Sequence, residues 1–191
     1  MRFIYSVMAS AAVVIAVLIL ALNQPSNALM ITAKPLLEEN ATPNRKLVAA
    51  KSEITPSAAG LVGVSQKISL AQLPMLWQAF NDKASLHQLL RKKPSRIYVY
   101  YRQFSALYDE ATVTIGYDVK ELLQPEIQTT LPEMSLQQVV LSDPYQEVQL
   151  GNAWQTIDYR QGVQAVVEVH ELGADSEIKR SAMFVAYPGK K

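Results

Sequence analysis

The chain has 191 residues, of which 49% are hydrophobic and 18% are charged, and it contains no cysteine. Its 18 lysines and arginines against 17 aspartates and glutamates leave no cationic excess, which argues against a nucleic-acid partner. Without cysteine the chain has no disulfide framework and no thiolate site, and its two histidines make a multi-histidine metal site hard to build. We therefore expect no metal and no cofactor.

The first predicted element is a membrane segment. Residues 3–22 are uncharged and mostly apolar, and a helix of that length crosses the ~30 Å hydrocarbon layer of a bilayer. Arg2 precedes the segment, so the positive-inside rule predicts a single-pass protein of the inner membrane with its C-terminal part outside the cytoplasm. A cleaved signal peptide is the alternative, because Ser26-Asn27-Ala28 has the pattern of a processing site. The apolar stretch is longer than the ~7–15 residues of such peptides, which favours an uncleaved anchor.

Residues 23–58 are expected to form a flexible tether. Prolines recur through this stretch among polar residues, and no hydrophobic period is sustained. A flexible chain of this length has a mean reach on the order of 30 Å, which would hold a domain clear of the lipid headgroups. The folded domain is then expected at residues 59–191, a length that buries a single core.

Within this domain the hydrophobic periodicity predicts the same order of elements twice: strand, helix, strand, strand. Alternating apolar residues predict a strand at 61–68, three- and four-residue spacing predicts helix over 70–90 with a break at Asn81-Asp82, and β-branched and aromatic runs predict strands at 96–104 and 111–119. The second series has extended chain at 136–150 broken at Asp143-Pro144, a short helix at 152–159, and strands at 162–171 and 180–187. The predicted fold class is α+β, built from two pseudo-repeated βαββ units behind one transmembrane helix.

Several of these segments resemble the GyrI-like effector-binding domain, also called the bacterial transcription activator effector-binding domain. The resemblance is carried in the first half by LWQAF at 76–80, IYVYY at 97–101 and VTIGYDV at 113–119. In the second half it is carried by Tyr145, AWQTI at 153–157 and VEV at 167–169. The resemblance implies a small-molecule-binding domain in which Glu168 projects into the ligand groove. This chain departs from the family pattern at His170, where the family commonly has a tyrosine, and a membrane segment stands where regulators have their DNA-binding region.

Five residues are the candidate ligand-binding residues: Glu168, Tyr98, Tyr100, Tyr145 and His170. Strand alternation places Glu168 and His170 on one face of their strand, and Tyr98 and Tyr100 together on one face of another. A carboxylate among aromatic walls suits a cationic, partly apolar ligand, with Tyr98 or Tyr100 expected to flank Glu168. The alternatives are a glutamate on a solvated strand face and a histidine that only makes structural hydrogen bonds. Trp77 and Trp154 are interpreted as core anchors.

The predicted function is that of an exported, membrane-tethered module that senses or sequesters small amphipathic, cationic ligands. Two alternatives stay open: an envelope subunit that binds a protein partner and whose groove is filled by its own side chains, and, less favoured, a small-molecule hydrolase that uses Glu168. We expect no enzymatic activity, because the sequence has neither a nucleophile elbow nor a metal motif. The ligand and any protein partner are not identified by the sequence.

Overall fold

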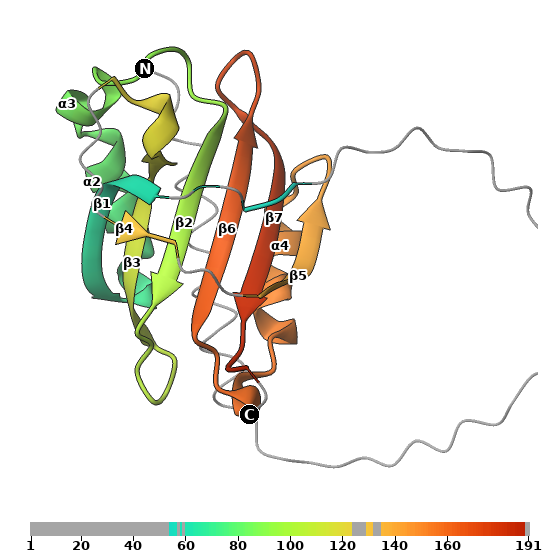
Figure 1. Cartoon of the computed structure of the whole chain (residues 1–191). Coiled ribbons are helices and arrows are strands. Elements are labelled where there is room, and N and C mark those ends of the chain that lie inside the picture. Colours follow the sequence, from blue (N-terminus) through green and yellow to red (C-terminus); the bar gives the residue numbers. More distant parts are fainter. Residues whose placement is uncertain (1–53, 57, 59, 124–128, 132–134, 190–191) are drawn as a thin grey trace, which may run out of the picture.

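The computed structural model describes residues 54–56, 58, 60–123, 129–131 and 135–189, which form an α+β fold around one antiparallel sheet (Figure 1). The sheet has seven strands in the order β4-β1-β3-β2-β6-β7-β5. Their bounds are β1 Gly60–Ser69, β2 Arg96–Arg102, β3 Glu110–Asp118, β4 Thr129–Thr130, β5 Leu136–Ser142, β6 Ala165–Leu172 and β7 Ile178–Ala186. The pairing of β2 with β6 joins strands from the two predicted units at the centre of the sheet.

The helices are short, and they follow β1 and β5 along the chain. They are α2 at Leu73–Asn81, α3 at Ala84–His87 and α4 at Glu147–Thr156, with 3-10 turns at Leu70–Gln72, Val119–Glu121 and Tyr159–Gln161. Pro74 in the first turn suits the start of α2, because an N-terminal helical residue needs no N–H donor. The buried residues of α2 recur at three- and four-residue spacing, so this helix has one apolar face turned to the sheet.

Each face of the sheet is buried by a different part of the chain. On the first face, apolar residues of α2 and α4 pack on residues such as Val99, Ile115 and Met183. On the second face, Tyr98, Tyr100 and Phe184 lie in a separate cluster with Ile54 and Ala58. Figure 1 shows α2 and α4 behind the sheet, and the segment that contains Ile54 and Ala58 running across in front of it.

The folded region starts earlier than predicted, because the segment that contains Ile54 and Ala58 is buried. Ile54 is 1% exposed and Ala58 is 5% exposed, although both belong to the predicted tether. Arg96 also holds this segment, since its guanidinium donates to the Thr55 carbonyl oxygen at 3.2 Å. The boundary expected at residue 59 is therefore too late, because an apolar residue spaced within a proline-rich stretch gives no periodic signal of its packing.

Two other predicted bounds are corrected. The extended stretch expected to reach residue 150 ends at Ser142, and the helix expected at 152–159 occupies Glu147–Thr156. The helix includes Gly151 although glycine is a poor helix former, and this residue is buried with Leu150 and Trp154 on the packed face of α4. Packing of that face on the sheet outweighs the local preference. The predicted break of the first helix at Asn81-Asp82 is confirmed by the end of α2.

The predicted membrane segment at residues 3–22 and most of the tether lie outside the described residues. Among the helices that the structure describes, none has the length and hydropathy needed to cross a bilayer.

A pair of glycines lets β1 and β3 approach closely. Gly63 pairs directly with Gly116 in an uninterrupted register, so Gly116 marks a close approach and not a bulge. A Cβ atom on Gly63 would lie 1.9 Å from the Ile115 carbonyl oxygen, an atom that cannot move without separating the strands.

We expect Gly63→Ala to lower the free energy of unfolding by about 2–3 kcal/mol, because the new methyl group overpacks the pair of strands. Gly189→Ala is the control, since a Cβ atom there has nothing within 4 Å. Urea unfolding followed by circular dichroism measures both variants. Equal midpoints for the two variants would contradict the close approach.

His87 links the end of α2 to β3. Its Nε2 lies 3.0 Å from the Phe80 carbonyl oxygen, and its Nδ1 lies 3.2 Å from the Tyr117 hydroxyl. The rings of Phe80, His87 and Tyr117 also contact one another. Burial, with a smaller effect from Glu121, raises the pKa of Tyr117 to about 12.

This pKa predicts a loss of stability in alkali. The unfolded chain loses the Tyr117 proton near pH 10 while the folded chain keeps it, so the free energy of unfolding falls as the pH rises from 10 towards 12. We expect about 1.4 kcal/mol of the loss between pH 8 and pH 11 to come from Tyr117. Urea midpoints at pH 8 and pH 11 measure it, and Tyr117→Phe should lose less over this interval than the wild type. An identical loss in the variant would assign the alkaline transition to other tyrosines.

Candidate functional site

The centre of the first face carries a buried carboxylate, that of Glu168. Strand alternation turns Val166 and Glu168 towards the helices and Val167 and Val169 towards the second face. Glu168 stands between Val99 of β2 and Met183 of β7 in the sheet, and the residue is 4% exposed. The alternative of a glutamate on a solvated strand face is therefore excluded.

Three side chains surround the carboxylate of Glu168. The Trp154 indole Nε1–H donates to Oε1 at 3.0 Å, and the Tyr101 hydroxyl donates to the same oxygen at 3.3 Å. The second oxygen, Oε2, lies 3.3 Å from Nε2 of His170. Because burying a charge is costly, these neighbours are what make the carboxylate tolerable in the core.

His170 extends this contact along β6. Its Nδ1 lies 2.7 Å from Oγ of Ser181, its cross-strand partner on β7, and its side chain is 3% exposed. Among the described residues, Nε2 of His170 makes no hydrogen bond, so its approach to Glu168 has the distance of an ion pair without the alignment of a hydrogen bond. The predicted placement of Glu168 and His170 on one strand face is confirmed.

Aromatic rings enclose this pair of residues. The Tyr101 and Trp154 rings meet edge to face at 4.9 Å beside Glu168, and the Trp77 ring meets the His170 ring at 5.9 Å. Burial, followed by the charge and hydrogen bond of Glu168, holds the pKa of Tyr101 well above its usual range, so this hydroxyl stays a donor. Both tryptophans lie in the core as predicted, and Trp154 is in addition a hydrogen-bond donor to the carboxylate.

Tyr98 and Tyr100 lie on the other face of the sheet from Glu168. Both belong to the second cluster, where Tyr98 interacts with the guanidinium of Arg96. The expectation that Tyr98 or Tyr100 flanks Glu168 is wrong, because the register of β2 and β6 turns Tyr101 and not its neighbours to the carboxylate. A ligand role for these two tyrosines stays a prediction for the second face.

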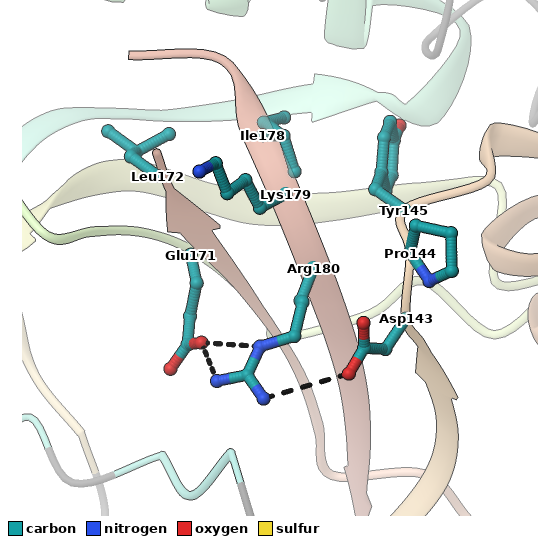
Figure 2. A pocket seen from close by; sticks show the side chains of 8 residues that line it. All are labelled: Asp143, Pro144, Tyr145, Glu171, Leu172, Ile178, Lys179 and Arg180. Carbon is teal, nitrogen blue, oxygen red and sulfur yellow. Dashed lines mark hydrogen bonds and ion pairs between the residues drawn. The ribbon is translucent and has the colours of Figure 1, made fainter. Parts of the chain in front are cut away.

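Tyr145 lies between His170 and the surface. Its ring meets the His170 ring edge to face with centroids 6.4 Å apart. On its other side Tyr145 lines a surface hollow of about 530 Å³, here called the β6–β7 hollow (Figure 2). The hollow is lined by Asp143, Pro144, Tyr145, Glu171, Leu172, Ile178, Lys179 and Arg180.

An ion-pair network forms the charged wall of the β6–β7 hollow. Arg180 bridges Glu171 and Asp143, as Figure 2 shows, and Arg96 donates to the other oxygen of Glu171 at 2.7 Å. Arginine forks of this kind position carboxylates firmly. The network therefore fixes the ends of β2, β6 and β7 next to Tyr145.

Two members of the site, Tyr101 and Ser181, were not predicted. Alternation within β2 or β7 shows which residues share a face, but only the pairing between strands shows that these two face Glu168 and His170. The sequence has no signal for that pairing, since β2 and β6 are more than 60 residues apart.

The order Ser181, His170, Glu168 is that of a hydrolase triad, but its setting is not. Ser181 is fully buried inside the sheet, paired with His170 of β6 and Ser142 of β5. A nucleophile must reach a substrate, and this hydroxyl is enclosed on both sides by strands. Within the described residues, no group of three or more acidic or histidine side chains has the geometry to hold a metal ion.

Neither the known family models nor the curated proteins include a match to this chain. The GyrI-like resemblance stays a prediction.

Proposed function

We propose that the chain is an exported, membrane-tethered module that binds small amphipathic cations at Glu168. One observation carries the proposal: a carboxylate that is 4% exposed lies at the centre of the sheet inside a shell of aromatic rings. A buried charged group points to a functional role, because a core of apolar residues in its place is usually at least as stable. The aromatic faces beside the carboxylate favour a positive charge that also has apolar groups.

The proposed site includes Tyr101 and Trp154 in place of Tyr98 and Tyr100. A ligand that pairs with Glu168 takes up space now filled by the side chains around it, so binding requires α4 or Tyr145 to shift. Half-buried Tyr145 contacts the His170 ring and also lines the β6–β7 hollow, so we propose that the ligand enters from this side.

The membrane attachment rests on residues 3–22 and the family assignment on the GyrI-like resemblance. We infer in the same sense that the domain contains two pseudo-repeated βαββ units. The strand order supports this, since β1-β3-β2 and β5-β7-β6 place the first, third and second strand of each unit in the same sequence. An alkaline phosphatase fusion after Lys191 tests the export, and activity only in cytoplasmic reporter fusions would refute it.

Calorimetric titration of the full chain in a non-ionic detergent tests the ligand class. Phenyltrimethylammonium is the cationic probe, and tert-butylbenzene is its neutral analogue of the same shape. We expect the cation to bind more tightly, and Glu168→Gln to weaken the cation by about 10- to 150-fold, as loss of a charged partner does. The neutral analogue should change little.

The second candidate function is a partner-binding envelope subunit. The observation that favours it is that Glu168 is 4% exposed, with Trp154, Tyr101 and His170 packed around its carboxylate. Equal binding of both probes, or none, together with an unchanged Glu168→Gln variant would favour this candidate.

A further inference from the structure

His170 is one of the positions at which this chain departs from the GyrI-like pattern that it resembles. Its imidazole stands next to the carboxylate of Glu168, with Nε2 at 3.3 Å from Oε2. The other contacts of the carboxylate are with Trp154 and Tyr101, which are neutral donors. Within the described part of the chain, His170 is thus the one group beside Glu168 that can carry a positive charge.

A buried carboxylate without a cation beside it is strongly unfavourable. The imidazole of His170, with Nε2 at 3.3 Å from Oε2, is placed to supply that cation. The position of Ser181 is compatible with an imidazolium, because its Oγ lies 2.7 Å from Nδ1 and can accept a proton from it while Nε2 faces the carboxylate.

The other elements packed against His170 bring no further charge. Helix α2 contributes Trp77, β2 contributes Ile97, and the segment after β5 contributes Tyr145. Of these described neighbours only Tyr145 titrates, and it is neutral at pH 7. The charge balance of the pair is therefore set by Glu168 and His170 alone.

We infer that His170 is the internal cation of the Glu168 site, and that an entering cationic ligand replaces it and releases one proton to the solvent. This inference rests on the proposed function. In the balance of the step, the carboxylate exchanges an imidazolium for the ligand cation, the imidazole becomes neutral, and the proton leaves. Without that release, two cations would share one buried carboxylate.

The β6–β7 hollow gives the proton a short way out. Tyr145 contacts the His170 ring on one side and lines the hollow on the other. One partly exposed side chain thus separates the imidazole from the solvent.

The release of a proton is measured by calorimetry with phenyltrimethylammonium, which has no proton of its own. Titrations of the full chain at pH 7 in phosphate and in Tris, which differ in ionisation enthalpy, give the number of protons released. We expect about one proton released per cation bound, and therefore an affinity for the cation that rises with pH. In His170→Gln the number of protons released should fall well below that of the wild type.

A second measurement keeps the inference testable if that variant does not fold. The chain has two histidines, so the nitrogen resonances of labelled His170 are separated from those of His87 by a single His87→Gln variant. We expect His170 in the ligand-free wild type to be an imidazolium at pH 7. A neutral His170, or cation binding without proton release, would overturn the inference and leave the proposed function intact. A cationic His170 with no binding of the probe would refute the proposed function, and with it the displacement step, while His170 would still be the internal cation of Glu168.

Discussion

Replacing Trp154 with alanine is expected to lower the free energy of unfolding by about 3–5 kcal/mol. The side chain is 2% exposed, its ring packs against Tyr101, and its indole N–H donates to Glu168. The variant therefore leaves a cavity and also removes the closer of the two donors to a buried carboxylate. Urea unfolding of the full chain measures the effect.

Trp154→Phe is the matched control. It keeps most of the apolar ring and removes the donor, so we expect a smaller loss of about 1–3 kcal/mol, the cost of an unmade hydrogen bond to a buried charge. A loss below ~1 kcal/mol for Trp154→Ala would show that α4 does not pack on the sheet as described.

The second large effect is expected at His170. His170→Phe leaves the carboxylate of Glu168 without its cation, and breaking a buried pair on one side costs about 3–5 kcal/mol. Adding Glu168→Gln to the same chain should recover at least ~1 kcal/mol, because no charge is then left unpaired. The glutamine oxygen still accepts from Trp154 and Tyr101, so the recovery reports on the charge and not on the two hydrogen bonds.

Adding Glu168→Gln to His170→Phe should raise the free energy of unfolding if the two residues are a coupled pair, and lower it if they are two independent core residues. Glu168→Gln alone serves as the control, and independent residues would give a double variant that is less stable than His170→Phe. A stable double variant that no longer binds cations would show that the pair is kept for binding and not for stability.

Local sequence patterns predict where the helices and strands lie better than they predict which of these elements pack against one another. The alternation in β2 and β6 predicts which residues share a face, and the positions of Glu168 and His170 follow from it. The choice of Tyr101 over Tyr98 depends on pairing between distant strands, which local periodicity does not contain. The burial of Ile54 was not predicted for a related reason, since it depends on a sheet face formed by residues far along the chain.

In helix α4, packing on the sheet overrides the local helix preference of the sequence. Its first turn contains Glu147 and its middle contains Gly151, and local preference would begin the helix after the glycine. The packing of Leu150 and Trp154 on the sheet extends it towards the N-terminus. Trp154 thereby reaches Glu168, so the packing that defeats the local prediction also builds the site.

The central claim, that cations bind at the carboxylate of Glu168, is tested most directly by the indole N–H resonances of the full chain. The chain has two tryptophans, and the indole of Trp154 donates to Glu168 at 3.0 Å. Saturating phenyltrimethylammonium should shift the Trp154 resonance in the wild type, with little change in Glu168→Gln and little with tert-butylbenzene. A Trp154 resonance that stays in place while the cation binds would contradict the account, because the ligand would then lie away from Glu168.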